Sequence, residues 1–258
     1  MLKDLFYLYT CIPINLFMND ASFHFKQFTI EQDRCAMKVG TDGVLLGAWV
    51  KVNGANRILD IGTGTGLIAL MLAQKSNAII DAIDIDKDAF EQAKKNTANS
   101  KWKERINIFH TSLQEFSGSS KNKYDLIVSN PPFFEGTYKA GTEARNIARH
   151  TDETLSFDDL ITGVKNLLKP GGRFCVILPF KEGNDFIEKA FLNNLFIQKL
   201  TRVKTKSEKQ EKRLMFEFGF EKTNAVEDDI VIQEADLSFT QEYIELTKAY
   251  YPGLKNPS

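Results

Sequence analysis

The stretch Asp60-Ile61-Gly62-Thr63-Gly64-Thr65-Gly66 decides the fold, because it joins an apolar run to a helical pattern. Its glycines let the backbone turn sharply and approach a ligand, and they leave main-chain N–H groups free at a helix N-terminus. A dinucleotide-binding loop, G-x-G-x-x-G, would need its third glycine where Leu67 stands. The loop therefore disfavours a nicotinamide cofactor, and an ordinary tight turn between a strand and a helix is the alternative interpretation.

Short apolar runs and helical patterns alternate outward from this loop, which predicts an α/β fold with a parallel sheet wrapped by helices. We expect strands at 57–61, 78–85, 106–109, 124–129 and 173–179, and helices at 67–74, 87–99, 157–168 and 185–193. Strands at 196–204 and 215–221 flank a charged loop and predict a hairpin at an antiparallel edge. A strand at 230–235 and a helix at 241–251 complete the chain.

The bulk composition predicts one globular domain. The chain has 258 residues, of which 43% are hydrophobic and 26% charged. We expect residues 18–258 to form this domain and residues 1–17 to be an N-terminal tail or a start-site extension. The apolar run at 6–18 is broken by Pro13 and Asn15, is shorter than the roughly 20 residues of a membrane span, and precedes no signal-peptide cleavage site.

Charge and cysteine content limit the kinds of partner and site that the protein can have. The formal net charge is −1, so a basic surface for nucleic acid must be local. The three cysteines, Cys11, Cys35 and Cys175, are far apart and form no C-x-x-C pair, which argues against a disulfide framework or a zinc site. We expect a cytoplasmic monomer that needs no metal and contacts no membrane.

Two acidic residues follow the second predicted strand. Asp84 and Asp86 lie on one face of that strand by alternation, and a carboxylate there can accept hydrogen bonds from both hydroxyls of a ribose. Asp86 fits the N-cap of the helix that begins at Lys87. We therefore assign Asp84 to the ribose.

Asn130-Pro131-Pro132-Phe133 ends the predicted strand at 124–129. An exocyclic amine of adenine is a poor nucleophile, so a site must hold its N–H groups in acceptors and align the nitrogen with the methyl donor. The Asn130 side chain and the Pro131 carbonyl offer two acceptors, the prolines stiffen the loop, and Phe133 offers a ring on which a base can stack. The alternative is a strand ended by a Pro-Pro turn.

The strand, the D-x-G-x-G-x-G loop and an acidic residue one strand later resemble the class I S-adenosylmethionine-dependent methyltransferases, which have a Rossmann-like sheet. The resemblance implies that Asp60 approaches the methionine amine of the cofactor and Asp84 its ribose, with Gly62, Gly64 and Gly66 forming the loop beneath it. The Asn-Pro-Pro-aromatic motif resembles amino-methyltransferases that act on adenine N6, cytosine N4 or a glutamine amide, and it implies catalytic roles for Asn130 to Phe133, with Asn130 also beside the cofactor.

Residues 28–49 and Ala148-Arg149-His150, together with both motifs, are similar to the bacterial tRNA1(Val) adenine-37 N6-methyltransferases over roughly residues 23–251. This resemblance implies that Lys38, Thr41 and Asp42 line the cofactor pocket and that the N-terminal segment covers the cofactor; helix capping is the alternative role for these residues. Ser112 takes the position of an acidic residue that binds the cofactor adenine, and a hydroxyl accepts more weakly than a carboxylate.

The predicted substrate is tRNA, and its phosphates need local positive charge. The stretch 199–213 holds seven basic and two acidic residues, and further basic residues follow Phe133. The basic candidates are Lys199, Arg202, Lys204, Lys206, Lys209, Lys212, Arg213, Lys139, Arg145, Arg149 and His150. A solvated hairpin and a solvated loop are the alternative.

Three other functions compete with tRNA methylation. Methylation of a protein glutamine uses a similar loop but normally follows a longer helical N-terminal domain. Another nucleic-acid substrate, such as rRNA, fits the same motif, whereas DNA adenine methyltransferases usually add a recognition domain. A non-catalytic RNA chaperone on this scaffold would not need the Asn130 to Phe133 motif.

Overall fold

The computed structural model describes residues 18–19, 21–34, 38–132 and 155–254. They form an eight-stranded sheet of order β11-β9-β10-β8-β7-β4-β5-β6 and a three-stranded sheet of order β1-β2-β3. The strands are β1 (Met18–Asn19), β2 (Ser22–His24), β3 (Thr29–Glu31), β4 (Arg57–Ile61), β5 (Ile79–Asp84), β6 (Ile106–His110), β7 (Tyr124–Ser129), β8 (Leu168–Pro179), β9 (Phe196–Lys204), β10 (Glu211–Gly219) and β11 (Val226–Val231). The helices are α1 (Thr41–Trp49), α2 (Leu67–Lys75), α3 (Lys87–Ala98), the 3-10 helix η3 (Lys103–Arg105), α4 (Leu113–Ser119), α6 (Phe157–Leu167), α7 (Phe180–Leu192) and α8 (Gln241–Thr247).

The large sheet is mostly parallel, as predicted. The five adjacent strands β8, β7, β4, β5 and β6 pair in parallel with one another. Strand β10 runs antiparallel to both β8 and β9, which confirms the hairpin. Strand β11 pairs in parallel with β9 on the outer side, so β11, and not the hairpin, forms this edge of the sheet.

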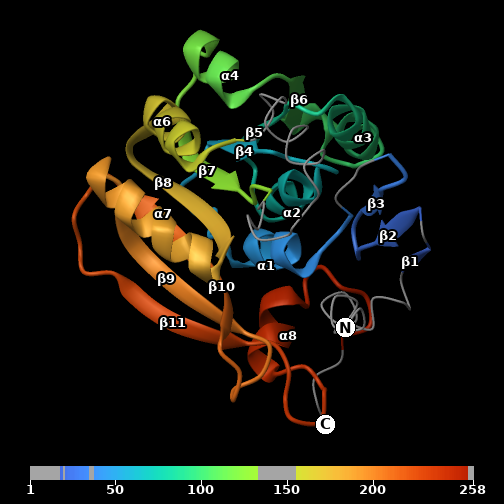
Figure 1. Ribbon diagram of the computed structural model, residues 1–258. Helices are drawn as coiled ribbons and strands as arrows, with labels where there is room; N and C mark the ends of the chain where they lie inside the picture. Colours follow the sequence, from blue (N-terminus) through green and yellow to red (C-terminus); the bar gives the residue numbers. More distant parts are fainter. Residues whose placement is uncertain (1–17, 20, 35–37, 133–154, 255–258) are drawn as a thin grey trace, which may run out of the picture.

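Helices cover both faces of this sheet (Figure 1), and the strands supply apolar residues to each face in turn. Ile58 and Leu126 pack in one buried cluster with α1 and α2 residues, whereas Leu59 and Ile127 pack in a second cluster with α6 and α7 residues. This alternation follows from the two-residue period of a strand. None of the described helices is both long and apolar enough to span a membrane.

The predicted bounds of β4, β7 and β9 agree with the structure, whereas those of β8, β10, β11, α7 and α8 differ by four residues or more. Strand β10 begins at Glu211, which shortens the predicted charged loop, and α8 ends at Thr247. Strand β8 begins at Leu168, five residues earlier than predicted, because residues 169–172 continue the strand through a register shift opposite β7. Helix α7 begins at Phe180, directly after β8. Strand β11 begins four residues earlier than predicted, because its acidic residues pair with basic residues of β9.

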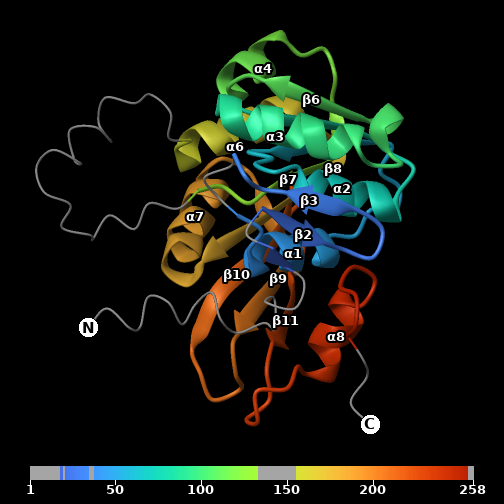
Figure 2. The same cartoon turned by 90° about the vertical axis from the view of Figure 1, so that its right-hand side faces the viewer.

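The small N-terminal sheet was not predicted, since its strands are only two or three residues long. It is held by aromatic contacts rather than by its own hydrogen bonds alone. Phe25 stacks on Phe28 at 4.7 Å and on Tyr251 at 5.8 Å between ring centroids, and Phe28 meets Trp102 at 5.9 Å. Figure 2 shows this sheet in front of α1 and α2. The aromatic contacts thus join the start of the described chain to its end.

A buried carboxylate links four strands in the sheet. Asp81 of β5 is only 2% exposed and accepts hydrogen bonds from Arg57 Nη2 of β4 at 2.9 Å, Asn107 Nδ2 of β6 at 2.8 Å and the Tyr124 hydroxyl of β7 at 2.7 Å. Removing an acceptor with this many partners leaves buried donors unsatisfied.

Replacing Asp81 with alanine is expected to lower the free energy of unfolding by about 3 kcal/mol, because the Arg57 charge loses its partner. Urea titration followed by circular dichroism measures the change. Tyr124→Phe removes a single hydroxyl and should cost about 1 kcal/mol. Asp185→Ala, at an exposed position of α7, is the control; an equal loss there would contradict the role of the Asp81 network.

Candidate active site

The candidate site lies between β4 and β7, where the order in which the strands are added to the sheet changes from one side to the other. From β4 the connections lead to β5 and β6, and from β7 they lead to β8 on the opposite side. Open α/β sheets bind ligands at such a switch point, outside the carboxyl ends of the strands. The last residues of the two strands, Ile61 and Ser129, are direct register partners, and Ser129 Oγ donates to the Ile61 carbonyl at 3.0 Å. The glycine loop and Asn130 therefore leave the sheet side by side.

The glycine loop is hydrogen-bonded to the end of β5 and has free space beside Gly62 and Gly64. Gly62 N and Thr63 N both donate to the Ile83 carbonyl at 3.0 Å. Gly62 and Gly64 have φ values of 69° and 57°, and a Cβ on either would meet no atom within 4 Å. These positions therefore need glycine for their backbone conformation and leave space for a ligand. Gly66 differs, because its Cβ would lie 3.4 Å from Ala93 and its role includes packing against α3.

Asp60 is fully buried below the loop. Its Oδ2 accepts from the Thr63 hydroxyl at 2.7 Å, while Oδ1 has no hydrogen-bond partner among the described residues. Burial raises the pKa of Asp60 to about 7, partly opposed by the Thr63 hydrogen bond. An unpaired carboxylate oxygen beneath the loop can accept a hydrogen bond from a ligand that brings an N–H donor. The contact of Asp60 with the cofactor amine stays a prediction.

Asp84 and Asp86 have separate roles at the end of β5. Asp84 accepts from Gly64 N at 2.8 Å and from Asp86 N at 3.0 Å, and burial raises its pKa. Asp86 accepts from Ala89 N at 2.8 Å and is the N-cap of α3, as predicted. Each oxygen of Asp84 has a second lone pair, so the carboxylate can accept from ribose hydroxyls while it holds the loop.

Asn130 is half-buried and lies against the first turn of α1. Its Nδ2 would be 3.9 Å from a Cβ added to Gly43, and Leu67 Cδ2 would be 3.1 Å from the same atom. Any larger residue at position 43 would therefore press on the side chains around Asn130. Pro131 is buried and Pro132 exposed. Phe133, the fourth residue of the motif, lies outside the described residues.

The predicted pocket residues Lys38, Thr41 and Asp42 lie at the start of α1. The N-cap of this helix is Gly40, with no side-chain capping bond, so the alternative capping role is not seen. Lys38 is exposed. Asp42 Oδ2 instead accepts from Arg213 Nε of β10 at 2.7 Å. Sequence reasoning missed this pair, because its members are 171 residues apart.

Helix α3 ties the N-terminal segment to the glycine loop. Asn96 Nδ2 donates to the carbonyls of Thr65 and Glu31, each at 2.8 Å, and Glu31 N donates back to Asn96 Oδ1 at 2.9 Å. Gln92 Oε1 accepts from Arg34 N at 3.0 Å. Both side chains are buried and polar, Gln92 in the middle of α3 and Asn96 in its last turn. Sequence reasoning missed this contact, because polar residues of a helix are mostly exposed.

Ser112 is the N-cap of α4. Its hydroxyl oxygen accepts from Glu115 N at 3.1 Å, and the Glu115 carboxylate in turn accepts from Ser112 N at 3.3 Å. This capping box uses one lone pair of the hydroxyl. A contact of Ser112 with the cofactor adenine stays a prediction. No group of three or more His, Cys, Asp or Glu side chains in the described ranges could hold a metal ion.

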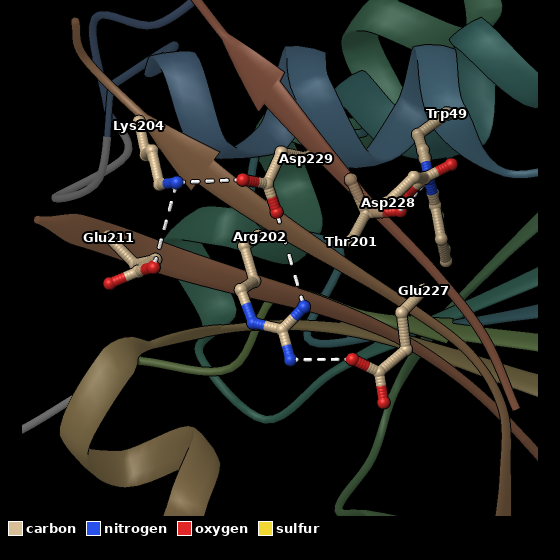
Figure 3. A network of polar contacts seen from close by, with 8 residues as sticks. All are labelled: Trp49, Thr201, Arg202, Lys204, Glu211, Glu227, Asp228 and Asp229. Carbon is tan, nitrogen blue, oxygen red and sulfur yellow. Dashed lines mark hydrogen bonds and ion pairs between the residues drawn. The ribbon is translucent and has the colours of Figure 1, made fainter. Parts of the chain in front are cut away.

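The basic stretch at 199–213 divides into paired and unpaired residues. Figure 3 shows the acidic side chains of β11 pointing toward basic side chains of β9. Arg202 pairs with Glu227 at 2.7 Å, Lys204 with Asp229 at 2.7 Å, and Lys199 with Asp228 at 2.8 Å. For these three the structure favours the alternative, a charged surface satisfied within the protein. The other basic candidates Lys139, Arg145, Arg149 and His150 lie outside the described residues.

Comparison with known proteins agrees with this geometry. The family model "Methyltransferase small domain" matches residues 36–206. The chain belongs to this methyltransferase family. A protein of Trichodesmium erythraeum is 46% identical over 91% of this chain and 99% of its own length, and one of Flavobacterium psychrophilum is 47% identical over 89% and 98%. Both are named tRNA1(Val) (adenine(37)-N6)-methyltransferase, which confirms the resemblance found in the sequence.

Solved structures support the same fold. A predicted O-methyltransferase of Agrobacterium tumefaciens, protein Atu636, superposes with a TM-score of 0.63 at 17% identity and covers 83% of this chain and all of its own. The glycopeptide N-methyltransferase MtfA, in complex with S-adenosylmethionine, gives a TM-score of 0.52 at 10% identity over 70% of this chain and 95% of its own. The class I methyltransferase fold is thus confirmed, and S-adenosylmethionine is the cofactor of the family.

Replacing Gly64 with alanine is expected to weaken S-adenosylmethionine binding about tenfold or more, a loss of at least 1.4 kcal/mol, because a Cβ enters the space in front of the loop. Isothermal titration calorimetry measures the affinity. Gly54→Ala is a matched control: its φ is +77° and its Cβ would also meet nothing within 4 Å. Both changes should cost about 1 kcal/mol of stability, so equal losses of cofactor affinity would contradict the prediction.

Proposed function

We propose that the protein transfers the methyl group of S-adenosylmethionine to the N6 amine of adenine 37 in a valine tRNA. The observation that carries this proposal is the pairing of Ile61 with Ser129, which sets the glycine loop beside Asn130. The relatives with this name match nearly their whole length. Their names favour RNA over a protein glutamine as the substrate, and adenine 37 of tRNA over a site in rRNA.

Asn130 and Pro131 hold the reacting amine in the proposed reaction. The Asn130 side-chain oxygen and the Pro131 carbonyl accept its two N–H groups and direct the nitrogen lone pair toward the cofactor. Asn130 Nδ2 is the amide atom near Gly43, while its oxygen lies more than 4 Å from that Cβ position. The bound cofactor supplies an electrophilic methyl carbon. The proton leaves after the nitrogen has become cationic, so no strong general base is needed.

The remaining site residues bind the cofactor in this proposal. Asp60 accepts from the methionine ammonium with its unpaired Oδ1, and Asp84 accepts from the ribose hydroxyls. Gly62, Gly64 and Gly66 shape the loop beneath the cofactor. Lys38, Thr41 and Asp42 close the pocket from α1, Ser112 faces the adenine, and Phe133 stacks on the substrate base.

We further propose that residues 18–258 act as one domain in the cytoplasm, as a monomer. The N-terminal segment packs on α3 and on Tyr251 through the contacts described above, which supports one folded unit. An anticodon-loop adenine is already single-stranded, so a protein of this size can take it out of its stack without a separate recognition domain.

The function is tested by incubating the protein with labelled S-adenosylmethionine and total tRNA, followed by mass spectrometry of the nucleosides. N6-methyladenosine is the expected product, and Asn130→Ala should lower kcat about 100-fold or more with little change in cofactor affinity. Asn122→Ala, an exposed asparagine before β7, should stay active. Label in protein and none in tRNA would overturn the proposal in favour of glutamine methylation.

Cofactor binding is expected to depend on pH through Asp60. Its pKa of about 7 in the free protein means that it is mostly neutral at pH 5.5 and half ionised at pH 7. Because a carboxylate attracts the ammonium more strongly than a carboxylic acid does, affinity should rise about tenfold between these values. Asp60→Asn should bind more weakly with a flat profile. An affinity that falls with rising pH in the wild type would contradict the assignment.

A further inference from the structure

The β9–β10 hairpin extends beyond the carboxyl end of β7, where Asn130 lies. Ser129 is level with Val176 of β8, and Val176 is level with Phe216 of β10. Arg213 pairs with Pro179, three residues further on, which is about 10 Å beyond the level of Ser129. The loop continues outward from there. We call residues 205–212 the hairpin tip.

The hairpin tip is also close to Asn130 in the direction across the strands. Only β8 separates β10 from β7, so the two strands are about 10 Å apart. Together with the rise along the strand, this puts the start of the hairpin tip about 15 Å from the end of β7, the length of about four stacked nucleotides. A strand of RNA with its target base at Asn130 can therefore reach the hairpin tip.

The charges of the hairpin differ between its strands and its tip. In β9, Lys199, Arg202 and Lys204 are paired with the acidic residues of β11. Lys204 also pairs with Glu211, which lies in the hairpin tip at the start of β10 (Figure 3). At the hairpin tip, Lys209 and Lys212 are exposed and make no ion pair with a carboxylate of the described residues. Within the hairpin, the exposed lysines without a carboxylate partner among the described residues are thus those nearest the carboxyl end of β7.

The hairpin tip is fixed in position from both sides. Arg213, which follows it, is bound to Asp42 at the start of α1. Lys206, within it, donates to the Ala235 carbonyl at 3.1 Å, and Lys209 N donates to the Lys206 carbonyl at 3.0 Å. A cation on a braced turn loses less freedom on binding than one on a free loop.

We infer that Lys209 and Lys212 bind phosphates of the RNA backbone that flank the target adenine. The inference rests on the proposed function and locates part of its substrate surface. The paired residues Lys199, Arg202 and Lys204 do not take part, because their charges are already matched by carboxylates. Binding at the hairpin tip is sequence-independent, since phosphates carry no base information.

The test compares Lys209→Gln/Lys212→Gln with the wild type, using fluorescence anisotropy with tRNA from 50 to 300 mM salt. Each phosphate that the protein neutralises on a single strand contributes about 0.7 to the slope of log affinity against log salt. Without the two lysines the slope should therefore fall by about 1.4 and affinity at 100 mM by about 20-fold. In turnover assays KM for tRNA should rise while kcat at saturation and S-adenosylmethionine affinity stay unchanged.

A matched control carries the same charge change at the other end of the strands, where β4 and β7 begin. Lys51→Gln/Lys121→Gln replaces two exposed lysines there and should keep the wild-type salt slope. Lys209→Arg/Lys212→Arg keeps both charges and should also bind normally, which separates a loss of charge from a loss of folding. An unchanged slope in Lys209→Gln/Lys212→Gln, or an equal loss in the control, would overturn the inference. A wild type that methylates no tRNA would instead refute the proposed function.

Discussion

The register between β4 and β7 is the constraint on which the site depends. Ile61 and Ser129 are paired, so the glycine loop and the Asn-Pro-Pro motif, which are far apart in the chain, leave the sheet at one place. A shift of two residues in this register would separate the two motifs by about 7 Å, which is beyond the reach of any methyl transfer. The large number of buried residues in β4 and β7 protects this register, because a one-residue slip of either strand would turn all of its side chains to the opposite face.

The buried Asp60 indicates how stability and function are balanced at this point. Burying a carboxylate with one unpaired oxygen is unfavourable, and for the same reason burial raises the pKa of Asp60. Asp81 shows the contrast, because it is equally buried but accepts three hydrogen bonds and joins four strands. Asp81 thus joins the strands of the sheet, whereas Asp60 keeps one unpaired oxygen beneath the glycine loop, and in the proposed function this oxygen accepts a hydrogen bond from the cofactor amine.

The sequence was most informative where local chemistry decides the structure. Strands β4 and β7 and the N-cap Asp86 could be predicted from apolar runs and capping preferences. The Asp42–Arg213 pair and the acidic strand β11 could not, because both depend on partners brought close only by the sheet topology. For the same reason the seven basic residues looked alike in the sequence. Only the structure distinguishes the three that β11 neutralises from the lysines of the hairpin tip.

This division of charge has a consequence for selectivity. A broad positive surface would bind every RNA in proportion to the phosphates it neutralises, whereas this chain has a net charge of −1 and pairs the strand cations with β11. A few unpaired cations beside the crevice contribute little to binding by themselves. They contribute most when the RNA backbone and a base held at Asn130 bind together, because the second contact is then intramolecular. Neutralising the strands therefore limits unproductive binding without weakening the productive complex.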